Sequence, residues 1–417
     1  MPDIPIEILQ EIFKQCFSLP LRTHKAWEFP WYLGHVCARW RALFFLMRST
    51  FWSKIDINSS ATSEKVSERI KEMVAFFLDR THGEPFSFKL YNYHPILLYL
   101  VDHSEQWEEV TIKLPPSKLG YLCGAMGRLP HLKKLDISAD KPDRRNRDGS
   151  PIPSNIFEDA PLLTHVVLWE PVMQYKFNWS SLTIVHFAKV KTLKNIHSIL
   201  REAINLVELI IEWFQWDSDS EGGGLIYLPH LERLDICDAL LLAIFEAPSL
   251  QRLKICFDPR QSINLFNAGI AVAFLRRSGI KLRTLVMTHC LAAIAKEILP
   301  FTPEVETLVL FNIKDVADLF MWLAGTGMQG LRQCRNLNIL RVQIPHAVYG
   351  KALGALHDMI ARRIPPGDVR DPSLREVTVI GTAPGWYFVF QSVVANLKKL
   401  CRDRGIHFSV AHRRGSF

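Results

Sequence analysis

The sequence lacks the patterns that mark a metal site. Its eight cysteines stand far apart, and no two of them have C-x-x-C spacing, so a zinc knuckle is not expected. Most lie inside apolar stretches such as Ile255–Phe257, which is typical of reduced thiols packed in a core. We therefore expect buried cysteines, a reducing compartment and no bound metal.

Long apolar segments are also missing. No apolar run approaches the ~20 residues that a membrane-spanning helix needs. The first residues carry acids at Asp3, Glu7 and Glu11, where a signal peptide carries cations. These absences predict a soluble protein of the cytoplasm, the nucleus or both, with no membrane partner.

Catalytic signatures are missing as well. The chain has no Walker A lysine pattern, no H-E-x-x-H and no G-x-S-x-G. Gly325–Gly330 spells G-x-G-x-x-G, but a predicted helix precedes it and Gly350 stands where a dinucleotide site needs an acid. We interpret this segment as a helix end and a flexible loop. The sequence thus predicts no catalytic residue, no cofactor and no enzyme activity.

The charge surplus is modest. The 50 Lys and Arg residues exceed the 42 Asp and Glu residues by eight. The densest basic stretch, Arg144–Arg147, lies among Asp140, Asp143 and Asp148, and no aromatic residues interleave with it as a stacking platform requires. Nucleic-acid binding is therefore the least favoured interpretation. With 48% hydrophobic residues, the chain has ample material for a folded core.

The first 57 residues predict a small helical module. Ile8, Leu9, Ile12, Phe13 and Cys16 recur with the spacing of one helix face. Pro5 suits the first helical turn. A second apolar helical pattern covers Leu33–Met47, and the aromatic run Phe51–Ile55 follows it.

These segments carry a resemblance. Ile4–Phe13, Leu33–Leu43 and Phe51–Trp52 resemble, in order and spacing, the parts of an F-box. The chain is similar to the large family of fungal F-box proteins with irregular repeats behind the box. It departs from the pattern by the long insert Ser18–Pro30 and by Ile4, where Leu is usual.

The resemblance implies a partner. An F-box binds a Skp-family adaptor, which docks on a cullin that carries a RING subunit. A module of ~50 residues buries little surface alone, and a partner helix would cover its remaining apolar groups. The implied adaptor-binding surface with its supporting core is Ile4, Pro5, Ile8, Leu9, Ile12, Phe13, Val36, Cys37, Trp40 and Trp52.

The rest of the chain repeats one phrase. A Pro or small residue is followed by Leu, two mostly polar residues, an apolar residue, a variable residue and another apolar residue. Leucine-rich repeats use this phrase at the strand with periods of about 20 to 29 residues, and here the intervals run from about 19 to 37. The copies begin near Pro130, Pro161, Ser181, Leu206, Pro229, Pro248, Leu282, Pro303, Leu337 and Pro372.

Helical patterns at 270–277, 292–298 and 316–323 lie between copies. We therefore predict an α/β fold in which a small all-α F-box module precedes an irregular leucine-rich-repeat-like solenoid with a curved parallel sheet. The predicted domains are the module at 1–57, a helical linker and first repeats at 58–106, the solenoid at 107–410 and a basic tail at 411–417. Polar insertions at 140–153, 217–224 and 364–372 are expected to be loops.

The function that follows is the substrate-recognition subunit of a Skp–cullin–F-box ubiquitin ligase, with an unknown protein target on the repeats. One alternative is a leucine-rich-repeat scaffold outside any ligase, whose N-terminal helices only cap the solenoid. The other is a nucleic-acid-binding repeat protein. Exposure of Ile8, Ile12, Val36 and Trp40 would favour the ligase, and their burial against residues beyond 60 would favour the cap.

Overall fold

The computed structural model of the chain describes residues 4–16, 20–58, 64–139, 154–169, 175–190, 193–214, 224–257, 265–325, 334, 336–344, 348–363, 374–381 and 390–412. The chain forms two compact units, Met1–Lys189 and Val190–Phe417. The boundary between the units falls inside the stretch predicted as one repeat region. The predicted insertions at 140–153, 217–223 and 364–372 lie outside the described residues.

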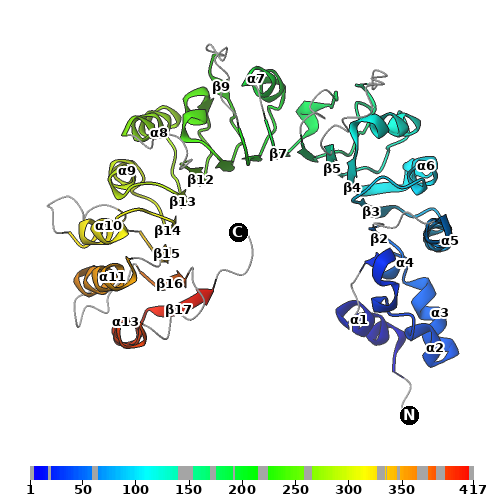
Figure 1. Ribbon diagram of the computed structural model, residues 1–417, viewed down its shortest axis with the longest axis horizontal. Coiled ribbons are helices and arrows are strands. Elements are labelled where there is room, and N and C mark those ends of the chain that lie inside the picture. Colours follow the sequence, from blue (N-terminus) through cyan, green and yellow to red (C-terminus); the bar gives the residue numbers. More distant parts are fainter. Residues whose placement is uncertain are drawn as a thin grey trace. The chain divides into compact units, whose positions relative to one another are not determined.

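The first unit begins with a group of helices, which we call the N-terminal lobe (residues 4–52). It contains α1 (Ile6–Cys16), α2 (Leu33–Val36), α3 (Ala38–Leu46) and α4 (Arg48–Phe51) (Figure 1). The single helix predicted over 33–47 is wrong, because Cys37 has an extended backbone between α2 and α3. The thiol of Cys37 accepts a hydrogen bond from the backbone N–H of Trp40 at 3.4 Å, which caps α3 in the way an N-cap side chain does.

The first unit continues as a parallel sheet whose strands follow one another in chain order. Its helices lie along one side of the strands (Figure 1). The first strand lies in the insert Ser18–Pro30, for which no element was predicted from the sequence. The strands are β1 (Leu21–Arg22), β2 (Lys54–Ile57), β3 (Phe86–Leu90), β4 (Trp107–Leu114), β5 (Lys134–Ala139), β6 (His165–Leu168) and β7 (Ile184–Phe187), and the helices are η1 (Thr23–Glu28), α5 (Glu64–Thr81), α6 (Ile96–Asp102), η2 (Ser104–Gln106), η3 (Pro116–Ala125) and η5 (Trp179–Ser181).

The second unit has the same plan. Its main strands pair in parallel, again in chain order, while β9 (Ile226–Tyr227) and β11 (Phe245–Glu246) form a separate parallel pair. The main strands are β8 (Glu208–Ile211), β10 (Arg233–Ile236), β12 (Arg252–Cys256), β13 (Thr284–Thr288), β14 (Thr307–Phe311), β15 (Ile339–Ile344), β16 (Glu376–Gly381) and β17 (His407–His412).

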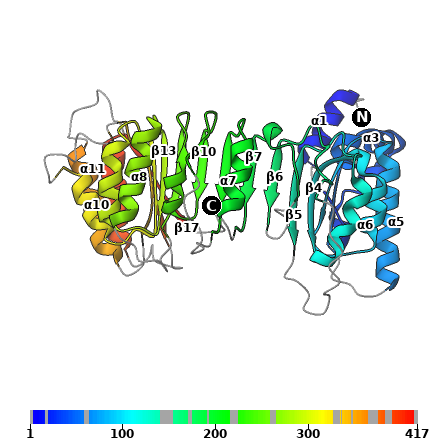
Figure 2. The same cartoon turned by 90° about the horizontal axis from the view of Figure 1, so that it is seen from above.

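Helices of the second unit lie along the outer side of its strands (Figure 1), with their axes roughly aligned with the strands (Figure 2). We call the opposite side of this sheet the inner face. The helices are α7 (Leu193–Glu202), η6 (Ala239–Ile244), α8 (Leu265–Ser278), α9 (Ala292–Ile298), η7 (Leu299–Phe301), α10 (Val316–Leu323), α11 (Tyr349–Arg363) and α13 (Gln391–Asp403).

The repeated phrase explains the main strands of both units. All ten copies contain a strand, and the helices predicted at 270–277, 292–298 and 316–323 coincide with α8, α9 and α10. The apolar positions of the phrase point into the core, since side chains alternate across a strand. The α/β prediction with parallel strands is thereby confirmed. The leucines of the best copies are all buried: Leu132, Leu135, Leu231, Leu234, Leu250, Leu253 and Leu308.

The glycine-rich segment after α10 behaves as a helix end. α10 stops at Leu323, and Gly325 takes a left-handed φ of 82° while its N–H donates to the carbonyl of Trp322. The predicted loop at 326–330 lies outside the described residues. Among the helices that the structure describes, none has the length and apolar character to cross a membrane.

Candidate protein-interaction surfaces

An aromatic core supports the N-terminal lobe. Phe13 of α1 lies edge-on to Trp40 of α3, with ring centroids 5.0 Å apart, and 6.2 Å from Phe51. Trp52 continues this core, because it packs against Phe44 at 5.2 Å. Leu9, Phe13 and Trp52, three of the residues implied by the F-box resemblance, are fully buried in this core.

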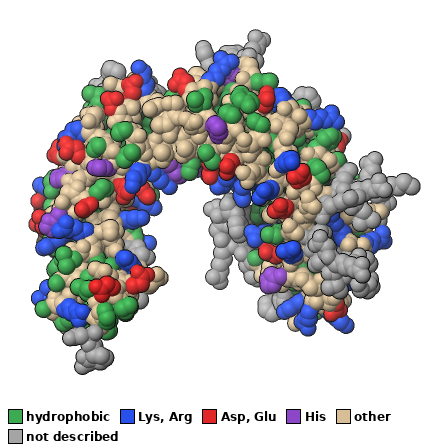
Figure 3. All heavy atoms as spheres, turned by 180° about the vertical axis from the view of Figure 1, so that it is seen from behind, with side chains coloured by type: hydrophobic (Ala, Val, Ile, Leu, Met, Phe, Trp, Pro, Cys, Tyr) green, Lys and Arg blue, Asp and Glu red, His purple; other side chains and the backbone are tan. Residues whose placement is uncertain are grey.

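On the outer side of α1, by contrast, the apolar side chains are exposed to solvent. Ile8 and Ile12 lie four residues apart on α1 and are 54% and 40% exposed, so they form an apolar stripe on the helix. Ile4, two residues before α1 begins, is 44% exposed. Val36 is 56% exposed. Figure 3 shows hydrophobic side chains beside Lys and Arg on the surface of the lobe.

A hydrogen bond joins the exposed residues near α1 to those near α3. The guanidinium of Arg39 donates to the carbonyl oxygen of Ile4 at 2.6 Å, which holds the start of α1 against the start of α3. Pro5 and Cys37 are also exposed, and Trp40 is half-buried. Seven of the ten implied residues are therefore reachable at the surface: Ile4, Pro5, Ile8, Ile12, Val36, Cys37 and Trp40.

The lobe is also joined to the strand stack. β1 pairs with β2 in parallel register, Leu21 beside Ile55. Trp52 lies 5.8 Å from Phe76 of α5, and the guanidinium of Arg80 stands 4.8 Å above the ring of Phe76. The deep side of the lobe thus covers the first strands of the sheet, while the stripe on α1 points away from its core.

The inner face of the second unit carries a ladder of charges across β8, β10 and β12. Arg233 reaches Glu208 and Asp235, each at 2.9 Å, and Arg252 lies 3.8 Å from Asp235. The Asp235 side chain is only 8% exposed. Hydrogen bonding to Asp235 is the main cause that raises the pKa of Arg233, so the guanidinium stays charged.

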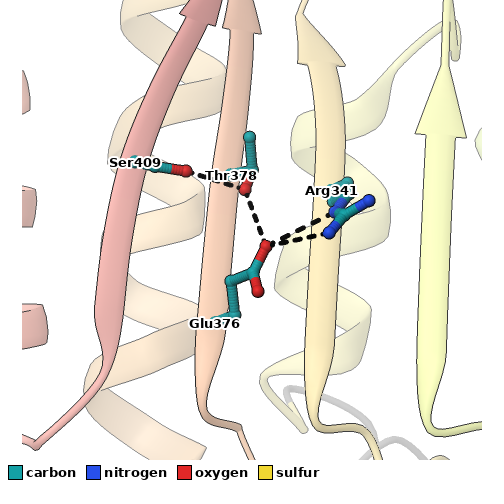
Figure 4. A network of polar contacts seen from close by, with 4 residues as sticks. All are labelled: Arg341, Glu376, Thr378 and Ser409. Atoms are coloured by element: carbon teal, nitrogen blue, oxygen red, sulfur yellow. Dashed lines mark hydrogen bonds and ion pairs between the residues drawn. The ribbon is translucent and has the colours of Figure 1, made fainter. Parts of the chain in front are cut away.

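A second polar ladder crosses β15, β16 and β17 (Figure 4). The guanidinium Nη2 of Arg341 donates to the carboxylate of Glu376 at 3.2 Å, and the hydroxyl of Thr378 donates to the same oxygen at 3.2 Å. The hydroxyls of Thr378 and Ser409 are 2.8 Å apart. Basic and acidic side chains lie close together on the side of this unit that Figure 3 shows.

An open cavity of about 480 Å³ lies over the first ladder and extends across the strands toward the second. That volume falls in the range of ligand-binding clefts. Polar and apolar groups line it together. Its lining includes Glu212, Arg233, Asp235, Cys237, Arg252, Lys254, Cys256, Thr288, His289, Phe311, Asn312, Gln343 and Ile380.

The first unit has titratable groups on its own sheet. Burial is the main cause that lowers the pKa of His165 to about 4, with help from the charges of Lys134 and His186. Burial likewise raises the pKa of Asp136, against the hydrogen bond from Trp169. Burial therefore favours the uncharged forms of both groups.

Four of the cysteine thiols are weak nucleophiles. Burial raises the pKa of Cys237 and Cys290 to about 12 and that of Cys334 and Cys401 to about 11, and a protonated thiol neither attacks nor ligates readily. All four are free. Within the described ranges, no three His, Cys, Asp or Glu side chains gather as a metal site.

Comparisons with known proteins add no relative: no protein-family model matches the chain, and no curated protein is significantly similar to it. The inner-face ladders and the cavity were not predicted from the sequence. Their residues occupy the polar and variable positions of the repeated phrase and the positions just after it. At Asp235 and Lys254, the only available signal is a charged residue between two buried ones.

Proposed function

We propose that the chain is the substrate-recognition subunit of a Skp–cullin–F-box ubiquitin ligase. The N-terminal lobe binds a Skp-family adaptor and, through it, a cullin–RING assembly. The two units behind it form a leucine-rich-repeat-like solenoid that holds a protein target. The chain itself is non-catalytic, and the chemistry of ubiquitin transfer belongs to its partners.

One observation carries this proposal. Ile8 and Ile12 form an exposed apolar stripe on α1, and Ile4 is exposed just before it, although an aromatic core lies beneath the same helix. Exposed aliphatic side chains aligned on one helix face are what a partner's groove or helix covers. The order of the sequence segments that resemble an F-box agrees with this surface.

A second function keeps some support. Trp52 packs on α5, and β1 extends the sheet into the lobe, as expected of a cap on a repeat scaffold outside any ligase. A cap and an adaptor-binding subunit differ in which side of the lobe they need. A cap needs the buried side of the lobe only, whereas an adaptor needs the exposed stripe.

The inner face favours a protein target over a nucleic acid. Glu208, Asp235 and Glu376 stand among the arginines of both ladders, and a phosphate backbone would meet these carboxylates as well as the cations. A surface of mixed charge suits a polypeptide with groups of both signs.

The test is affinity purification of the tagged full-length chain from cells, followed by mass spectrometry. The proposal expects a Skp-family adaptor and a cullin among the co-purified proteins, and it expects both to be lost when Ile8 and Ile12 are changed to Ala. Recovery of other proteins with no adaptor would favour the scaffold.

A further inference from the structure

The cavity on the inner face has a regular floor. Register pairs Cys256 with Thr288, Thr288 with Phe311, Phe311 with Gln343 and Gln343 with Ile380, and all five line the cavity. They form one row at right angles to β12–β16. Neighbouring strands are ~4.8 Å apart, so this row spans roughly 19 Å, the reach of about six extended residues.

A buried amide lies in this row without a partner. Gln343 is 2% exposed, and its Nε2 has no hydrogen-bond partner in the part of the chain that the structure describes. A buried donor is normally satisfied. An acceptor from outside the chain, such as a backbone carbonyl of a ligand in the cavity, would satisfy it.

Cations line the cavity at β12, and acids line it toward β10 and β8, where Asp235 and Glu212 lie. Arg252 stands directly beside Arg233 in register. Its one ion pair among the described residues is a 3.8 Å contact with Asp235, which Arg233 also holds. Lys254, on the same strand, forms no ion pair in the part of the chain that the structure describes. This uncompensated cation favours a carboxylate there.

We propose that this cavity binds an extended acidic segment of a partner protein, with a side-chain carboxylate at Arg252 and Lys254 and a backbone carbonyl at the Gln343 amide. The inference rests on the proposed role as a receptor for a protein target, and it adds where and by what chemistry the target binds. Phe311 and Ile380 supply apolar contacts in the same row.

The experiment starts from a display library of random peptides of about twelve residues, selected on the immobilised full-length chain. An enriched peptide is then synthesised, and its affinity is measured by fluorescence anisotropy. The proposal expects enrichment of Asp and Glu. Lys254→Glu should weaken the peptide at least about ten-fold, because it places a like charge against the carboxylate. The matched control Lys351→Glu, on the exposed side of α11, should bind within about two-fold of wild type.

A second variant separates binding from folding. Gln343→Leu replaces the unpaired amide by an apolar group of similar size, so the melting temperature should not fall, while the peptide should bind about ten-fold more weakly. Enrichment without acidic residues, or equal loss in Lys254→Glu and Lys351→Glu, would overturn the inference. So would a single-stranded RNA probe that binds wild type and is lost in Lys254→Glu.

Adaptor binding by the same preparation distinguishes the two proposals. If the adaptor binds and acidic peptides do not, the inference about the cavity is wrong and the proposed function stands. If acidic peptides bind in the cavity but the chain does not bind the adaptor, the cavity is still a binding site for acidic segments and the ligase assignment is wrong.

Discussion

The ring of Phe13 lies edge-on to the ring of Trp40, with centroids 5.0 Å apart and planes inclined by 70°. This contact fixes α1 on α3 from its buried side. The aliphatic stripe of Ile8 and Ile12 is left on the other side. Changes on the two sides of α1 should therefore have separable effects on folding and on binding.

Removing the buried ring should loosen the lobe. Phe13→Ala empties a fully buried site and should cost about 3–5 kcal/mol of local stability. Hydrogen exchange should show faster exchange in α1 and α3, with β12–β16 unchanged. Ile6→Ala, on the exposed part of the same helix, is the control. Equal exchange in wild type and Phe13→Ala would contradict this account of the core.

Trp52 and Trp107 occupy the same structural position. Both rings are fully buried. Each indole N–H donates to a carbonyl of the preceding helical segment, that of Phe44 at 3.2 Å and that of Leu100 at 3.0 Å. Trp52→Phe and Trp107→Phe should each destabilise the first unit by about 1–3 kcal/mol, as denaturant titration would measure. If Trp52→Phe left stability unchanged but weakened adaptor binding, Trp52 would belong to the binding surface.

These tryptophans also show how much of the fold could be predicted from the sequence. The repeated phrase identified ten strands, because in each copy Leu is followed by apolar residues at short, fixed intervals. It missed β2, where Trp52 stands in place of Leu before Ile55. The phrase is present there with tryptophan in place of leucine, since either side chain can fill the same core position.

Two other features needed the structure. The break at Cys37 lies inside an unbroken apolar helical pattern, so periodicity alone gives one helix there. The ladders on the inner face join residues far apart in sequence, such as Arg341 and Glu376. Which variable positions meet depends on strand register, and the lengths of the intervening loops vary too much to fix it from the sequence.

The imidazole of His165 should make the first unit sensitive to acid. Its folded-state pKa is lowered to about 4 from 6.5, so between these values the unfolded chain binds more protons and stability falls as the pH drops. Asp136, with its raised pKa, acts in the opposite direction, so the comparison is between variants. His165→Gln should lose less stability than wild type between pH 7 and about 4.5. Unfolding midpoints across that range test it, with exposed His131→Gln as control; identical wild-type and His165→Gln profiles would refute this assignment.

Cys37 should report on the adaptor surface. It is exposed, while Cys290, Cys334 and Cys401 are buried and hold raised pKa values. A maleimide reagent at neutral pH should modify Cys37 well before those three, as peptide mapping by mass spectrometry would show. Bound adaptor should slow the reaction at Cys37. Unchanged labelling of Cys37 in an adaptor complex would place the interface elsewhere.

The central claim is most directly tested by the affinity of the purified chain for a Skp-family adaptor, measured by isothermal titration calorimetry. Wild type should bind, and Ile8→Ala with Ile12→Ala should weaken binding by roughly 100-fold or more, because two interface anchors cost ~2 kcal/mol or more each and ~1.4 kcal/mol is a decade. Circular dichroism should stay unchanged, because both side chains are exposed. A matched double change of exposed leucines outside the lobe, Leu98→Ala with Leu162→Ala, should bind like wild type. Absence of adaptor binding by the folded wild-type chain would contradict the ligase assignment, and equal affinity of the Ile8/Ile12 variant would contradict the stripe as the binding surface.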